Sequence, residues 1–147
     1  MPGRNKSRER ALQVLYPIDV RKLTVEESLN SFYTSLHSTD EIPTERLEKD
    51  KFMEQLVHGV LRTQVAIDDA ITRHSTNWRI ERMAPVDRNI LRIAIFELQS
   101  GDQSPAVVID EALELATRFS GKESAGFVNG ILDAIRKSLP AAVVDKA

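Results

Sequence analysis

The chain of 147 residues contains no cysteine. This absence excludes disulfide bonds, thiolate zinc sites and thiol nucleophiles, and it fits a reducing compartment. No apolar run approaches the length of about 20 residues that a membrane-spanning helix needs. The polar, basic start of the chain also lacks the apolar stretch of a secretory signal. We therefore expect a soluble, cytoplasmic protein.

A strong excess of one charge is missing as well. The formal net charge is -2, which excludes a globally basic nucleic-acid-binding protein but allows a local basic patch. Such a patch lies at the start of the chain, where six basic residues face only Glu9 and Asp19. The basic residues are Arg4, Lys6, Arg8, Arg10, Arg21 and Lys22.

Residues for catalysis are scarce. Neither of the glycine-rich phosphate-binding motifs, GxGxxG and GxxxxGK[ST], is present. Glu54 and His58 are four residues apart, a spacing that suits a metal or acid–base pair, but a third ligand is missing. A pair on a helix surface is the favoured interpretation. We predict that the protein is not an enzyme and needs no cofactor or metal.

Apolar residues recur with helical period, and no alternating strand pattern with hairpin turns is found. We predict an all-α, single compact bundle of about six or seven helices over 1–147, with a frayed tail at 141–147. Loops are expected at 37–44 and around Trp78 and Ile80. The helical segments run from Arg8 to about Tyr16, from Thr24 to Leu36, from about Glu45, and after Pro85, Ser104 and Gly121, the last one stopping at Pro140.

Proline and glycine predict local features of these helices. Pro17 should kink or end the first helix, and Gly59 should bend the third. Gly101 suits a helix C-terminus, and Ser104 followed by proline suits an N-cap. Gly126 and Gly130 are four residues apart and suggest that another backbone packs closely there. The segment after Pro85 has almost no polar face and should be the central helix.

The basic cluster at the start is the best candidate for a binding site. Arg4, Lys6 and Arg8 lie at or before a helix start, where cations oppose the helix dipole, so helix stability does not explain them. Contact with phosphate explains them, and a merely soluble terminus is the alternative. Tyr16 follows and offers a stacking surface for an unpaired base, although an isolated tyrosine is more often part of a core.

Four segments resemble the NusB family in order and spacing. They are RNKSRERALQVLY at 4–16, FMEQLVHGVL at 52–61, VDRNILRIAIFEL at 86–98 and VIDEALELATRFSGKESAGFVNGILD at 108–133. The resemblance covers nearly the whole chain and is weakest at 23–51. It implies two packed helical subdomains that bind the single-stranded boxA element of ribosomal RNA leaders. In the family this occurs with the ribosomal protein NusE, and the pair joins RNA polymerase to achieve transcription antitermination.

The resemblance also assigns site residues. The family's RNA-binding positions fall on Arg4, Lys6, Arg8, Tyr16, Glu123 and Phe127, with Lys122 beside them as a phosphate contact. The family's partner-binding positions fall on Glu81, Asp87 and Arg92. From periodicity alone, Phe127 fits a core position equally well. The helix dipole alone would also favour Glu81 and Asp87 near a helix start.

Two further interpretations remain open. One is a NusB-like domain of a ribosomal RNA cytosine methyltransferase, although the catalytic domain and its cysteines are missing from this sequence. The other is a homodimeric helical scaffold without RNA affinity. Neither length nor composition decides between a monomer and a homodimer.

Overall fold

The computed structural model describes the backbone of residues 3–40, 49–75 and 79–139, and the side chains of all of these except 37–40. The described ranges contain six α-helices, one short 3-10 helix and no strand. The prediction of an all-α fold is confirmed. The predicted tail at 141–147 and Trp78 lie outside the described residues. The helices are α1 (Arg4–Arg21), α2 (Val25–Asp40), α3 (Lys51–His74), η2 (Ile80–Arg82), α4 (Pro85–Ser100), α5 (Pro105–Phe119) and α6 (Lys122–Ser138).

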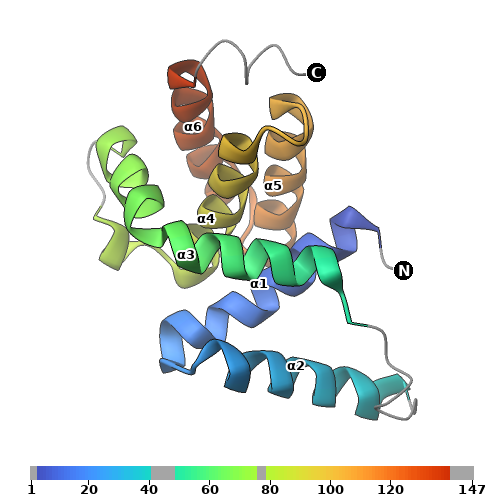
Figure 1. Cartoon of the computed structure of the whole chain (residues 1–147). Helices are drawn as coiled ribbons and strands as arrows, with labels where there is room; N and C mark the ends of the chain where they lie inside the picture. Colours follow the sequence, from blue (N-terminus) through green and yellow to red (C-terminus); the bar gives the residue numbers. More distant parts are fainter. Residues whose placement is uncertain (1–2, 41–48, 76–78, 140–147) are drawn as a thin grey trace.

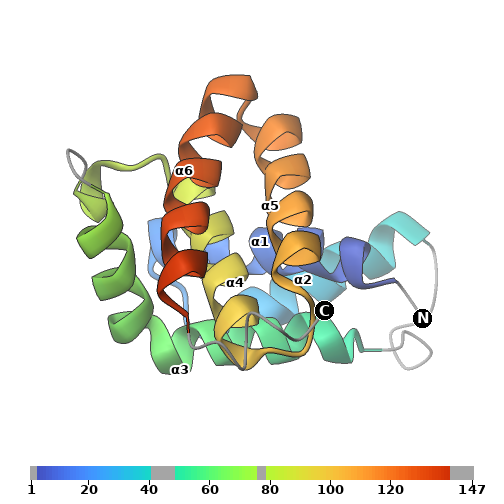
Figure 2. The ribbon, with the colours of Figure 1, turned by 90° about the horizontal axis from the view of Figure 1, so that it is seen from above.

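The helices form two groups. Helices α1, α2 and α3 make one group, in which α1 packs against both α2 and α3 (Figure 1). Helices α4, α5 and α6 make the second, side by side with alternating direction (Figure 2). Helix α4 connects the groups because it also packs against α1 and α3. This arrangement matches the two packed subdomains expected from the sequence.

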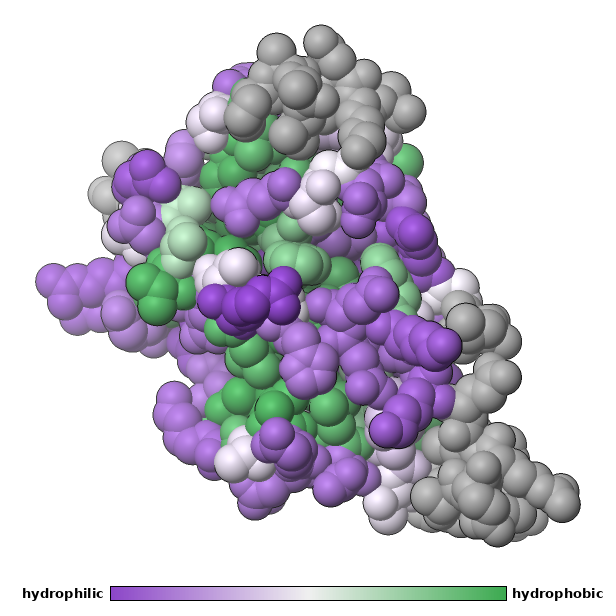
Figure 3. All heavy atoms as spheres, viewed as in Figure 1, coloured by the Kyte–Doolittle hydropathy of each residue, from purple (hydrophilic) through white to green (hydrophobic). Residues whose placement is uncertain are grey.

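Helix α4 is the centre of the core, as its nearly continuous apolar sequence predicts. Its buried apolar side chains contact α1, α3, α5 and α6. On the face shown in Figure 3, hydrophilic side chains cover most of the surface and apolar ones show only in patches. The buried apolar residues of α4 are Ile90, Leu91, Ile93, Ala94, Ile95 and Leu98.

Several helix ends follow directly from the sequence. Gly101 ends α4 in the left-handed conformation with φ 73°, as predicted. The Ser104 hydroxyl accepts a hydrogen bond from the Val107 N–H, and Pro105 occupies the first position of α5. Helix α3 begins at Lys51 rather than at about Glu45. The reason is Asp50, whose side chain accepts from the Met53 N–H at 3.0 Å and caps the helix.

The prediction that Pro17 ends the first helix is wrong. Helix α1 begins at Arg4 and continues through Pro17 to Arg21. Proline removes only its own N–H, whereas its carbonyl oxygen still accepts from the N–H groups of Lys22 and Leu23 at the end of the helix. Lys22 then stops the helix in the left-handed conformation, with φ 59°.

The predictions for Gly59, Gly126 and Gly130 are also corrected. Helix α3 departs from helical geometry at Thr63 (φ -111°, ψ 15°), where the Thr63 hydroxyl donates to the carbonyl oxygen of Gly59 at 2.7 Å. Gly59 itself is required because a Cβ there would collide with the ring of Phe96. Gly126 and Gly130 are exposed, and apart from the neighbouring part of α6 itself no described atom lies within 4 Å of a Cβ built on either. The expected close backbone contact is therefore absent from the described part of the chain.

Candidate nucleic-acid interface

Arg8 is buried rather than presented to solvent. Arg8 is only 4% exposed, and its guanidinium donates to both carboxylate oxygens of Glu97 at 2.6 and 2.8 Å. Burial works against the charge, but the hydrogen bond and the charge of Glu97 outweigh it and raise the pKa of Arg8. The expectation that Arg8 reaches RNA phosphate from outside the apolar stripe is corrected. A signal was available, because Arg8 has helical spacing to Leu12 and Leu15 on the buried face.

Arg4 and Lys6 are exposed, but they lie on different sides of the first turn of α1. The Arg4 guanidinium lies 4.8 Å from the centre of the Phe52 ring on α3. Lys6 is directed the other way, where its Nζ lies 3.2 Å from Glu9. The predicted basic cluster is therefore divided into one buried cation and two accessible ones.

Glu9 links α1 to the end of α5. It accepts from Arg118 at 3.0 Å as well as from Lys6. Burial opposes its charge, yet the pKa of Glu9 is lowered by Lys6 and Arg118 together. Tyr16 lies two helical turns beyond Glu9 on the same face of α1 and is 38% exposed. The interpretation of Tyr16 as a core residue is thus excluded by its exposure.

Two residues that the sequence analysis did not select complete this surface. Phe119 has helical spacing to the buried Ala112 and Ala116, which predicts a buried position, but it is 42% exposed at the end of α5. The Arg118 guanidinium lies 5.1 Å from the centre of its ring. Lys122 and Glu123, in the first turn of α6, are exposed beside them in sequence. Lys6 and Arg118 meet at Glu9, Tyr16 is on the same face of α1 as Glu9, and Phe119 and Lys122 are near Arg118 in sequence. We call this group the α1–α6 face, defined by Lys6, Tyr16, Arg118, Phe119 and Lys122.

The stripe pattern misplaced Phe119 because the core ends before α5 does. Ala116 is fully buried, whereas the next helical turn extends beyond the packed part of the bundle.

A hollow of about 290 Å³ lies between the starts of α4 and α6. Phe127, which is half-buried, and Glu123 line it together with Asp87 and Met83. The structure therefore brings two residues expected to touch RNA next to one expected to touch the partner protein. Periodicity alone fits Phe127 to a core position as well as to a surface position. In the structure Phe127 is half-buried at the edge of the hollow, so part of its ring packs inward and part stays accessible.

Asp87 has an unused acceptor in this hollow. The residue is 7% exposed, and its Oδ2 accepts from the Ser124 hydroxyl at 3.0 Å. Its Oδ1 is buried and has no hydrogen-bond partner among the described residues. A buried carboxylate oxygen without a donor is costly, so this atom favours a ligand that supplies an N–H or O–H group.

Arg92, the third residue expected to bind the partner, is enclosed within the protein. It is 5% exposed and donates to both oxygens of Asp68 at 2.8 and 3.0 Å. A third hydrogen bond, of 3.2 Å, reaches Asp19. These contacts join α4 to α3 and α1, so Arg92 holds helices together and does not offer its charge to a partner surface. Glu81, by contrast, is exposed in η2.

Residues 5–137 of the chain match the model of the NusB family. The chain belongs to the NusB family. It is 49% identical over 140 residues to the transcription antitermination protein NusB of Solibacter usitatus, which covers 95% of this chain and 92% of that protein. A solved structure of T. maritima NusB is similar with a TM-score of 0.79 and 30% identity, covering 97% of this chain and 96% of that one.

A second solved structure bears on ligands. It is a crystal structure of antitermination factors NusB and NusE in complex with dsRNA, and one of its chains matches this one with a TM-score of 0.75 and 29% identity. The match covers 92% of this chain and 97% of that chain. The family membership expected from the sequence motifs is therefore confirmed.

Elsewhere in this NusB-family chain, no hydrogen bond joins Glu54 to His58 among the described residues. Glu54 instead accepts a hydrogen bond from the Tyr33 hydroxyl at 2.6 Å. Burial and then the hydrogen bond to Glu54 raise the pKa of Tyr33. Among the described residues, no group of three or more His, Cys, Asp or Glu side chains is placed to hold a metal ion. None of the described helices is long and apolar enough to cross a bilayer.

Proposed function

We propose that this chain is a cytoplasmic, non-catalytic transcription antitermination factor. It binds boxA-type single-stranded RNA of ribosomal RNA leaders as a heterodimer with the ribosomal protein NusE. This heterodimer loads onto RNA polymerase complexes. The observation that carries the proposal is the α1–α6 face, where exposed cations and exposed aromatic rings share one surface. The names of the relatives and the solved complex with NusE and RNA support it.

The α1–α6 face suits an unpaired strand. Lys6, Arg118 and Lys122 supply charges for phosphate, and Tyr16 and Phe119 supply ring faces for bases. Paired bases are stacked inside a duplex, so exposed aromatic side chains gain most from bases that are free to turn outward. Electrostatic attraction alone would bind duplex and single strand alike. The two rings therefore favour single-stranded RNA.

We expect Tyr16→Ala to weaken binding of a boxA-like RNA by about 1–3 kcal/mol, the usual contribution of one base–aromatic stack. Because Tyr16 is exposed, the free energy of unfolding should change little. Titration with labelled RNA and a denaturant melt measure the two quantities. The matched control is Val20→Ala, an exposed apolar truncation one turn further along α1. Equal losses of affinity in both variants would contradict a stacking role.

The hollow at the start of α4 is the proposed contact with the basic partner protein. Asp87 offers an unpaired carboxylate oxygen there, and Glu81 adds an exposed negative charge nearby in sequence. A guanidinium or ammonium group of the partner would supply the missing donor. Burial of the Asp87 carboxylate makes such a contact stronger than one at an exposed rim.

We expect Asp87→Asn to weaken association with NusE by on the order of 2 kcal/mol or more, because it removes a buried charge that faces a cation. Glu81→Lys should have a smaller, salt-dependent effect. Both effects should exceed the change in RNA binding by the isolated protein. Glu26→Lys, an exposed reversal on α2, is the control. Unchanged pull-down of NusE by Asp87→Asn would restrict Asp87 to a structural role beside Ser124.

A further inference from the structure

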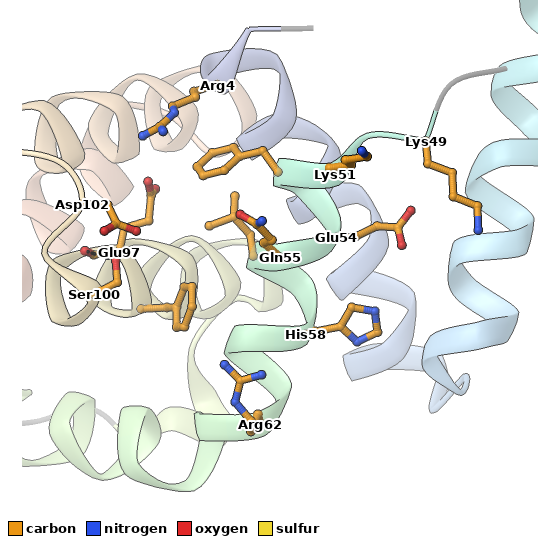
Figure 4. Close-up of a pocket in the computed structure, with 13 residues that line it drawn as sticks. Arg4, Lys49, Lys51, Glu54, Gln55, His58, Arg62, Glu97, Ser100 and Asp102 are labelled. Atoms are coloured by element: carbon orange, nitrogen blue, oxygen red, sulfur yellow. Dashed lines mark hydrogen bonds between the residues drawn. The ribbon is translucent and has the colours of Figure 1, made fainter. Parts of the chain in front are cut away.

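A second and larger hollow, of about 580 Å³, lies between the start of α3 and the end of α4. It borders the first turn of α1 through Arg4 (Figure 4). None of the residues assigned from the family resemblance lies in it except Arg4. Its principal lining residues are Arg4, Phe52, Gln55, Arg62, Phe96 and Asp102.

The lining combines aromatic rings with arginines at its two ends. Arg4 and Arg62 lie at opposite ends of the hollow in Figure 4, and Phe52 and Phe96 are half-buried parts of its wall. Phe52 and Arg62 are ten positions apart on α3, a separation of about 15 Å at a rise of 1.5 Å per residue. The hollow is therefore long enough for more than one nucleotide.

The charges at the two ends are available to a ligand. Arg62 is exposed, and within the described ranges no carboxylate forms an ion pair with it. The Arg4 guanidinium lies 4.8 Å from the centre of the Phe52 ring, and Arg4 is exposed at the border of the hollow. The carboxylate of Glu97 is paired with Arg8, and the other lining carboxylates are Glu54, which accepts from the Tyr33 hydroxyl, and Asp102 just after α4.

The first turn of α1 joins this hollow to the α1–α6 face. Arg4 contacts Phe52 on the side of α3, while Lys6 contacts Glu9, which is joined to Arg118 on the side of α5. A strand that passes over this turn meets Lys6 on one side and Arg4 on the other. Because Arg4 and Lys6 are only two residues apart, a flexible polyanion that crosses the first turn of α1 can reach both surfaces.

We propose that the hollow holds a second stretch of the same single-stranded RNA, beyond the part bound on the α1–α6 face. A base stacks against the guanidinium of Arg4, which Phe52 supports from behind, and a phosphate is bound by Arg62. Gln55 and Asp102 offer acceptors for base amino groups. An arginine stacked on an aromatic ring favours a planar base over a flexible acidic peptide. This inference rests on the proposed RNA-binding function.

The test compares a short boxA-like RNA, which fills only the α1–α6 face, with the same RNA lengthened stepwise at either end. The wild-type chain should bind a lengthened RNA more tightly. Arg62→Ala should weaken binding of that RNA about fivefold at about 0.1 M salt, because one phosphate contributes about 0.7 to the slope of log affinity against log salt. The short RNA should bind Arg62→Ala unchanged. Arg73→Ala, an exposed arginine further along α3, is the control.

The outcomes separate the two proposals. If the short RNA does not bind, or binds without depending on Tyr16, the proposed function fails. If the short RNA binds through Tyr16 but lengthening adds no affinity, the inference about the hollow is overturned alone. An equal loss on both RNA lengths in Arg62→Ala also overturns it. So does weaker binding of NusE to Arg62→Glu with RNA binding intact, since the hollow would then be a protein contact.

Discussion

Arg8→Ala is expected to reduce the free energy of unfolding by about 3–5 kcal/mol, the usual cost of removing one partner from a buried ion pair. The substitution leaves the Glu97 carboxylate buried without the two hydrogen bonds, of 2.6 and 2.8 Å, that neutralise it. It also removes the stem that packs beside Ile90 and Leu115 in the core. Equilibrium unfolding in urea, followed by circular dichroism, measures the loss.

Two comparisons make this result specific. Lys6→Ala removes an exposed ion pair in the same helical turn and should change stability by no more than about 1 kcal/mol. The double variant Arg8→Met with Glu97→Leu removes both charges and should recover much of the loss, since apolar replacements of buried pairs are often neutral or stabilising. A melt of Arg8→Ala that matches Lys6→Ala would mean that the pair with Glu97 contributes little.

The sequence predicts the architecture well where a single physical cause dominates. The missing polar face after Pro85 places α4 in the centre because four other helices can bury it. Gly101, through its left-handed backbone, and Ser104, through its side-chain cap, define the turn between α4 and α5. In each case the residues that decide the structure lie close together in the sequence, so their type and spacing are enough to predict it.

The prediction fails where the decisive partner is distant in sequence. The sequence predicts Arg8 to be one cation of an exposed cluster, because its partner Glu97 lies far away in the sequence on another helix. Arg92 is misplaced for the same reason, since its partners Asp68 and Asp19 come from α3 and α1. Resemblance to a family carries over positions but not their exposure. A residue at such a position can stabilise the fold or bind a ligand, and the residue type alone does not distinguish the two roles.

The site itself could be predicted only in part. Tyr16 and Lys122 are exposed and Phe127 is half-buried, so each has surface that a ligand can reach, although their role in RNA binding stays a prediction. The pair of Arg118 and Phe119 could not be selected from periodicity, because the apolar stripe of α5 continues past the end of the core. Where a helix leaves the bundle depends on the lengths of its neighbours, which a helical pattern does not contain.

Asp19 is the second residue from which a large effect is expected, because it holds the far end of α1 against α4. Arg88 donates to its two carboxylate oxygens at 2.6 and 2.8 Å, and the Asn89 amide and Arg92 donate at 2.9 and 3.2 Å. Burial opposes the charge, but the hydrogen bonds from Arg88 and Asn89 and the charge of Arg92 outweigh it. The pKa of Asp19 is therefore below its usual value of 3.8.

The direction of this pKa sets the pH dependence of stability. A carboxylate whose pKa is lower in the folded state binds its proton more weakly there than in the unfolded chain. Its contribution to stability is fully present above the unfolded pKa, near 3.8, and is lost as the pH falls through the lower folded pKa. Acid should therefore weaken the contact between α1 and α4.

We expect Asp19→Asn to lose about 3 kcal/mol or more at neutral pH, because Arg88 and Arg92 then share a site with one fewer negative charge. Below the folded pKa the wild-type chain carries a neutral Asp19, so the difference between the two proteins should shrink there. Urea melts of both proteins from neutral to strongly acidic pH measure this convergence. Asp69→Asn, which removes an exposed ion pair with Arg73, is the matched control and should give a small difference at every pH. A constant gap between wild type and Asp19→Asn across the acid range would show that the carboxylate has the same pKa folded and unfolded, and that the variant acts through packing alone.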